Sequence, residues 1–176
     1  MNKWQKNILV AVALVAGQIL LFNNLQLRGI LNSFVAPCIY ILYILILPMS
    51  ISRVYLLLIS FSLGLSVDAL SGTLGLNAAA CVLVGFVRPL VVKRFVSREE
   101  PNKGVRPSIY TLKFFNFTFY AFILSFAFHL ALFFLEIFTL YEAYFTLLRA
   151  LLSATAAVVI MIMLEIFFEK RDNRYR

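Results

Sequence analysis

The sequence predicts an all-α polytopic membrane protein with six transmembrane helices and both termini in the cytoplasm. Hydrophobic residues make up 62% of the 176-residue chain and charged residues 14%, whereas a soluble domain has about 45–50% and about 25%. Several apolar runs approach the roughly 20 residues that cross a bilayer as a helix. In addition, lysines and arginines gather in the connections that would share one side of the membrane.

Six apolar runs define the expected helices. The first is interpreted as an uncleaved helix, because Asn23 and Asn24 follow it where a signal peptide would have a small-residue cleavage site. The second tolerates Pro37 near its start, since an N–H in the first turn has no helical partner, and it ends at Pro48. Within a single transmembrane domain, residues 1–176, the expected helices cover about residues 7–24, 34–50, 54–70, 76–96, 114–138 and 143–168.

The stretch 64–89 joins the third and fourth expected helices. It places an acidic residue, Asp68, inside an apolar run and then turns through residues 71–75, which include Gly72 and Gly75. A second apolar run, rich in small residues, follows the turn. We expect the rest of the chain to pack as membrane helices around this stretch.

The distribution of basic residues predicts the orientation. Proline, glycine and mixed charge mark residues 97–113 as a loop between the fourth and fifth helices. With six helices, this loop shares one side with both termini. Of the 16 basic residues, all except Arg28 and Arg149 lie on that side, so the positive-inside rule assigns it to the cytoplasm.

Several function classes are excluded or disfavoured by the residue pattern. The net charge of +8 does not indicate nucleic-acid binding, because the basic residues follow the membrane topology. Standard catalytic motifs such as HExxH, GxSxG and the P-loop are absent from the sequence. Cys38 and Cys81 each lie in an apolar run without clustered ligands. We therefore expect no enzyme activity, no cofactor and no metal site.

Polar residues at membrane depth are functional hypotheses, because charges there are costly. Asp68 and Arg149 are expected at comparable depth near the outer side, so an ion pair between them is one hypothesis. The alternative is that each reaches its own interface or a wet cavity. His129, alone in an aromatic helix, is expected to be a hydrogen-bonded packing residue. Asn77 is expected to satisfy the backbone of the Gly75 turn.

Small residues at helical spacing predict close helix contacts. Ala13 and Gly17 stand four residues apart in the first helix. We expect the small faces of the third, fourth and sixth helices to meet a partner. Their small residues include Gly64, Gly85, Ala150 and Ala154.

The stretch 64–89 resembles the rod shape-determining protein MreD family. The residues that carry the resemblance are Gly64, Asp68, Ser71-Gly72, Leu74-Gly75-Leu76-Asn77-Ala78, Gly85 and Arg88-Pro89. The overall plan is similar over nearly the whole chain, in length, six spans, a short loop after the fourth span and a charged tail. The resemblance implies a non-enzymatic scaffold in the bacterial inner membrane. It implies binding to the single-span protein MreC and, indirectly, to actin-like MreB filaments and peptidoglycan synthases, besides contact with membrane lipids.

A second family shares part of this pattern. The G-x-x-x-D-x-x-x-G spacing is also similar to the substrate-binding S-components of energy-coupling factor vitamin transporters, which are six-helix proteins with both ends inside. That resemblance implies an outward pocket near Asp68, Asn77 and Arg149, and a docking face at Ala13 and Gly17. The outer halves hold few polar groups to bind a vitamin. A scaffold unrelated to either family remains open as a third hypothesis.

Overall fold

The computed structural model describes residues 3–23, 35–95, 105–137 and 143–172. This part of the chain is helical, with no strand among the described residues. In chain order its elements are α1 (Lys3–Gly17), the π-helix η1 (Gln18–Asn23), α3 (Leu42–Leu45), α4 (Arg53–Ser71), α5 (Leu76–Phe95), α6 (Ile109–Leu112), α7 (Phe114–Ile137) and α8 (Ala143–Asp172).

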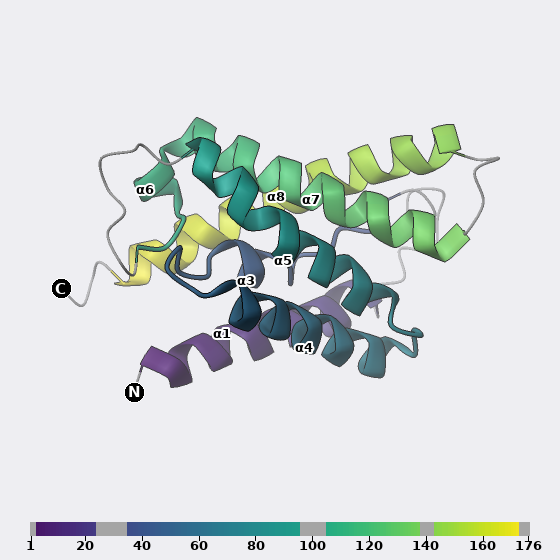
Figure 1. Ribbon diagram of the computed structural model, residues 1–176, viewed down its shortest axis with the longest axis horizontal. Helices are drawn as coiled ribbons and strands as arrows, with labels where there is room; N and C mark the ends of the chain where they lie inside the picture. The colour runs from purple at the N-terminus through teal and green to yellow at the C-terminus, as the bar shows by residue number, and fades with distance from the viewer. Residues whose placement is uncertain (1–2, 24–34, 96–104, 138–142, 173–176) are drawn as a thin grey trace.

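Four helices, α4, α5, α7 and α8, are long and apolar enough to cross a membrane. They run antiparallel in sequence order, as α4 packs on α5, α5 on α7 and α7 on α8 (Figure 1). The all-helical architecture of the described residues is thereby confirmed, as are four of the expected helices, each long and apolar enough to span a membrane. The apolar part of α1 is shorter, over Leu9–Leu20, so a total of six spans stays a prediction.

The prediction of a helix over residues 34–50 is wrong. Residues 35–39 are extended, a turn follows at residues 40–41, and only the four residues of α3 are α-helical before the irregular residues 46–52. Pro37 and Pro48 lack an N–H, and each disfavours the α conformation in the residue before it. The 35–52 segment is therefore mostly non-helical, although its side chains are buried from Cys38 to Leu42 and from Ile44 to Leu47.

The α4–α5 hairpin is closed by two glycines and held together by two others. Gly72 and Gly75 adopt positive φ angles of 70° and 82°, which L-residues with a side chain rarely tolerate. An ideal Cβ on Gly64 would lie 2.5 Å from Cα of Ala78 in α5. One on Gly85 would lie 2.5 Å from Oγ of Ser60 in α4. The two helices thus approach closely because these positions lack side chains.

Positive charge is concentrated at one end of the bundle. The first residues of α4 and α7 and the last residues of α5 and α8 lie at that end, together with the start of α1 (Figure 1). Exposed cations there are Arg53, Lys93, Arg94, Arg106 and Lys113. This arrangement agrees with the charge pattern of the sequence, while the assignment of that end to the cytoplasm stays a prediction.

Substitution of Gly64 by alanine should separate α4 from α5, because the added methyl group meets α5 backbone. We expect Gly64→Ala to lower the free energy of unfolding by about 1–3 kcal/mol, measured by thermal unfolding in detergent. Gly17→Ala is the matched control, since a Cβ there meets no atom within 4 Å. Equal melting temperatures for the two variants would contradict the close contact.

Candidate functional site

The carboxylate of Asp68 joins the two helices of the α4–α5 hairpin. Its Oδ1 accepts hydrogen bonds from the Thr73 hydroxyl, from the Asn77 backbone N–H at 3.1 Å and from the Asn77 side-chain amide at 2.9 Å. Its Oδ2 accepts from the Ala78 N–H at 2.8 Å. The N–H groups at the start of α5 have no helical partner, so a carboxylate of α4 satisfies them. Asp68 is only 2% exposed.

Tyr40 links this hairpin to the 35–52 segment. Its hydroxyl donates to Oδ1 of Asn77 at 2.7 Å, and its ring meets Phe128 of α7 edge-on at a centroid distance of 5.8 Å. The side chain of Asn77 bonds to the side chains of Asp68, Thr73 and Tyr40, so the expectation that it satisfies the backbone of the Gly75 turn is wrong. It instead connects the hairpin to a second segment. Its contact with Tyr40 has no signal in the sequence, because the two residues lie 37 positions apart.

Three polar side chains satisfy the extended backbone between Ala36 and Ile39. Gln18 of η1 donates to the Pro37 carbonyl at 3.2 Å and accepts from the Ile39 N–H at 2.9 Å. Ser153 of α8 accepts from the Ala36 N–H at 3.1 Å. His129 of α7 accepts from the Cys38 N–H at 3.2 Å. Non-helical backbone at membrane depth is tolerated where protein groups satisfy it, and these side chains do so.

The two ring nitrogens of His129 have different neighbours. Nδ1 lies 2.7 Å from the Ser125 carbonyl oxygen, one turn earlier in α7, whereas Nε2 lies 3.2 Å from both the Cys38 N–H and the Ala36 carbonyl oxygen. A proton on Nδ1 satisfies the shorter carbonyl contact and leaves Nε2 to accept from Cys38. His129 is 0% exposed. The expectation of a hydrogen-bonded packing histidine is confirmed.

Two arginines and a tyrosine satisfy the carbonyl groups at the end of α3. Nε of Arg88 donates to the Tyr120 hydroxyl at 3.1 Å, and its Nη2 donates to the carbonyls of Leu45, at 3.3 Å, and Leu47. Tyr120 in turn donates to the Leu45 carbonyl at 2.9 Å. Arg106 donates to the Ile46 carbonyl at 3.3 Å. The last carbonyls of a helix carry partial negative charge, which favours guanidinium groups.

The structural role of Arg88 is not apparent from the sequence, although Arg88-Pro89 forms part of the MreD resemblance. The charge pattern places Arg88 among the cations of the cytoplasmic side, but it is 2% exposed and lies inside the bundle. The available signal is its position within the apolar run of α5, about one and a half turns before Lys93 and Arg94. Gln18, Tyr120 and Ser153 also escaped notice, because a polar residue in an apolar run does not reveal its partner.

The hypothesis of an Asp68–Arg149 ion pair is wrong. Arg149 forms its salt bridge with Glu136 of α7 at 3.2 Å, and its guanidinium lies 4.1 Å from the ring centroid of Phe133. Asp68 is instead bonded within the α4–α5 hairpin. Two residues at the same depth can face different neighbours, so a similar depth of Asp68 and Arg149 does not make them a pair.

The small residues expected to meet a partner are mostly used inside the chain. Ala150 and Ala154 of α8 are 0% exposed, and the place of a Cβ on Gly64 is taken by α5. The expectation that these faces of the third, fourth and sixth predicted helices are free for docking is therefore corrected. Ala13 is exposed and Gly17 has no neighbour within 4 Å of an ideal Cβ, so none of the described residues covers the small face of α1.

The arrangement is one of structural support rather than of reactive groups. Within the described ranges, no three histidine, cysteine or carboxylate side chains gather as a metal site would require. Cys38 and Cys81 are free and buried. The clustered polar groups hold backbone: Asp68 holds the start of α5, and the residues around the 35–52 segment hold its amides and carbonyls.

Asp68 and Arg149 should be energetically independent. Asp68→Ala leaves buried donors of α5 unpaired, at about 1–3 kcal/mol for each. In a double-mutant cycle with Arg149→Ala we expect the two losses to add within about 0.5 kcal/mol. The cycle of Asp68→Ala with Asn77→Ala should instead show coupling above that value. Thermal or denaturant unfolding in detergent gives the stabilities of the wild type, the three single variants and the two double variants, and coupling of Asp68 to Arg149 would contradict the assignment.

Arg88 should contribute more to stability than the exposed cations at the same end of the bundle. Arg88→Met leaves the Leu47 carbonyl without its guanidinium donor, at about 1–3 kcal/mol per buried acceptor. Tyr120→Phe should cost less, because Arg88 still donates to Leu45. Arg94→Met, at an exposed position, is the matched control and should leave the melting temperature nearly unchanged. A melting temperature for Arg88→Met equal to that of the control would refute the role.

No protein family, curated protein or solved structure matches this chain. The likeness of residues 64–89 to the MreD family is thus a likeness of residue pattern, and membership of that family stays a prediction.

Proposed function

We propose that this chain is a non-enzymatic membrane scaffold of the MreD type, acting in the bacterial inner membrane. The observation that carries the proposal is the use of its buried polar side chains. Asp68, Asn77, Arg88 and His129 are bonded to the chain's own backbone or to one another. They hold a shape, and the surface they leave for other molecules consists of apolar helix faces and the basic end of the bundle.

The residue pattern 64–89 supports the same conclusion. Gly64 and Gly85 allow close contact of α4 with α5, Gly72 and Gly75 close the turn, and Asp68 satisfies the start of α5. Each of these tasks concerns the hairpin, not a ligand. A protein that shares this pattern with the MreD family would also share the hairpin. Its partner would then bind to the outer surface of the bundle.

The partner we propose is an MreC-like single-span membrane protein. A single transmembrane helix fits against another where small residues permit close approach. Ala13 and Gly17 in α1 provide such a position, since both remain free of contacts with the rest of the described chain that would block it. Through this partner the protein would influence MreB filaments and peptidoglycan synthases, and hence rod shape.

A vitamin-transporter S-component is the second candidate, favoured by the same free face on α1. An S-component needs polar groups that converge on a substrate. The residues that the resemblance would assign to this task are already bonded elsewhere: Asp68 and Asn77 to the hairpin and to Tyr40, and Arg149 to Glu136. This use of the polar groups makes the scaffold the better-supported proposal.

Affinity capture from gently solubilised bacterial membranes tests the proposal. We expect a single-span, coiled-coil protein to remain bound to the tagged chain. Ala13→Leu and Gly17→Leu should each reduce its recovery about tenfold or more, as the larger side chain keeps the partner helix at a distance. Quantitative mass spectrometry of the captured material gives the ratio.

Ala79→Leu is the matched control, because Ala79 is an exposed small residue on a different long helix. It should leave recovery of the partner unchanged. Capture of an ATPase module together with ligand-dependent stabilisation by a vitamin would favour the transporter instead. Equal recovery in all variants would exclude the α1 face as the contact.

A further inference from the structure

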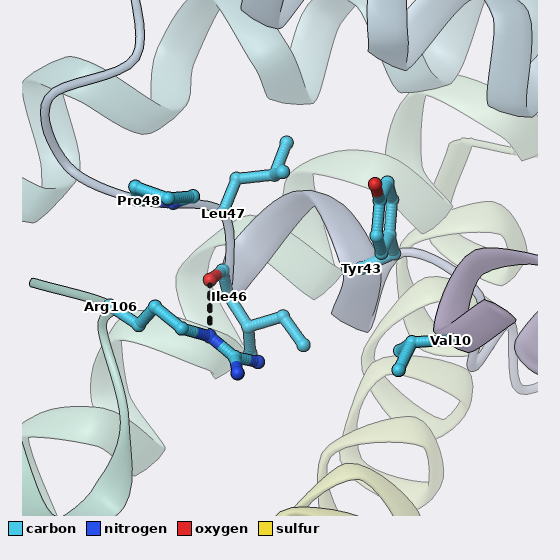
Figure 2. A pocket seen from close by; sticks show the side chains of 6 residues that line it. All are labelled: Val10, Tyr43, Ile46, Leu47, Pro48 and Arg106. Atoms are coloured by element: carbon cyan, nitrogen blue, oxygen red, sulfur yellow. Dashed lines mark hydrogen bonds between the residues drawn. The ribbon is translucent and has the colours of Figure 1, made fainter. Parts of the chain in front are cut away.

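A small cavity opens beside Arg106 at the basic end of the bundle. Its volume is about 30 Å³, which is room for about two water molecules. Figure 2 shows the Arg106 side chain beside the backbone of residues 46–48, with α1 on the far side of the cavity. The lining residues are Val10, Tyr43, Ile46, Leu47, Pro48 and Arg106.

The guanidinium of Arg106 is only partly used by the protein. Its Nε donates to the Ile46 carbonyl, and Figure 2 shows the two terminal nitrogens directed away from that carbonyl, toward the side of Val10. The backbone that carries Arg106 is fixed next to the same segment, because the Met49 N–H donates to the Val105 carbonyl at 3.0 Å. The charge is thus held at the cavity rather than free on a mobile chain.

A second guanidinium lies behind the same backbone. Arg88 binds the carbonyls of Leu45 and Leu47 from inside the bundle, while Arg106 binds that of Ile46 from outside. Within the described residues the salt bridge present is Arg149–Glu136, so no described carboxylate within 4 Å neutralises either Arg88 or Arg106. Carbonyl dipoles offset only part of two full positive charges, and the cavity wall therefore favours an anion.

The surroundings identify the kind of anion. Arg53, Lys93, Arg94 and Lys113 are exposed at this same end of the helices, where a bilayer has its headgroups. The remaining lining of the cavity is apolar apart from Tyr43, and its volume of about 30 Å³ leaves no room for glycerol or acyl carbons, which would lie outside it. A guanidinium fork matches the two unesterified oxygens of a phosphodiester. Two such oxygens need about the space of the two water molecules that the cavity accommodates.

We propose that the Arg106 cavity binds the phosphate group of an anionic membrane lipid. Arg106 donates to the phosphate, Arg88 adds positive potential from behind the wall, and the rest of the lipid lies outside the cavity. Val10 of the lining lies three and seven residues before Ala13 and Gly17 of α1, so the cavity borders the α1 face on which the partner would dock. The lipid proposal rests on Arg106 and Arg88 and does not depend on the proposed function.

Native mass spectrometry of the detergent-purified full chain tests this site. Phosphatidylglycerol, phosphatidylethanolamine, a diacylglycerol with the same acyl chains, and inorganic phosphate are titrated in turn. We expect phosphatidylglycerol to bind most tightly and the diacylglycerol not to be retained. Arg106→Gln should weaken phosphatidylglycerol binding about tenfold, the loss expected for hydrogen bonds to a charged group. Arg94→Gln, which removes one exposed charge at the same end, should retain full binding.

Val10→Phe keeps Arg106 and fills the cavity from α1. It therefore tests whether the cavity binds the lipid even if Arg106→Gln fails to fold. We expect it to weaken phosphatidylglycerol binding to a similar degree. Equal losses in Arg106→Gln and Arg94→Gln, or full binding in Val10→Phe, would overturn the proposal. If inorganic phosphate bound as tightly as phosphatidylglycerol, the site would be one for a free anion. That result would overturn the proposal of a lipid ligand.

Discussion

The structure depends on how a non-helical segment is accommodated within an apolar bundle. Every backbone N–H and C=O that leaves water must find a partner, at a cost of several kcal/mol where it does not. The helices α4, α5, α7 and α8 meet this requirement within themselves, but the 35–52 segment does not. Its partners come from η1, α5, α7 and α8: Gln18, Arg88, His129 and Ser153.

This requirement explains why polar residues interrupt the apolar runs. Gln18 and Ser153 would be unfavourable on a lipid-facing surface, yet both are buried and donate to or accept from the 36–39 backbone. Arg88 is the extreme case, with a full charge enclosed by protein. Its carbonyl partners at the end of α3 give it several acceptors, and this helps a charged side chain to stay in the interior. The polar residues of this chain are thus mostly explained by its backbone.

How well the fold could be predicted depends on whether a segment satisfies its own backbone hydrogen bonds. The four long helices could be predicted from sequence, because each is a continuous apolar run that satisfies its own backbone. The hairpin turn was also accessible, through Gly72 and Gly75. The 34–50 run could not be assigned correctly by hydrophobicity, since a buried irregular segment has the same composition as a buried helix. Its conformation is decided by His129 and Ser153, which lie 91 and 117 positions from the amides they accept from.

The candidate site was even harder to predict from the sequence than the fold. Depth in the membrane could be estimated for Asp68 and Arg149, but the direction each side chain faces around its helix could not. The Arg106 cavity is formed by α1, the 35–52 segment and the residues before α6, and no local pattern reports that three distant segments meet.

The long sequence separation of these hydrogen bonds has a consequence for biosynthesis. As a ribosome delivers the chain from its N-terminus, the amides of Ala36 and Cys38 enter the membrane environment before His129 and Ser153 have been made. Until α7 and α8 arrive, that stretch must keep its hydrogen bonds with water or with the insertion machinery. The bundle therefore cannot fold one helix at a time. The 35–52 segment can reach its final position only after α8, the last helix, has been made.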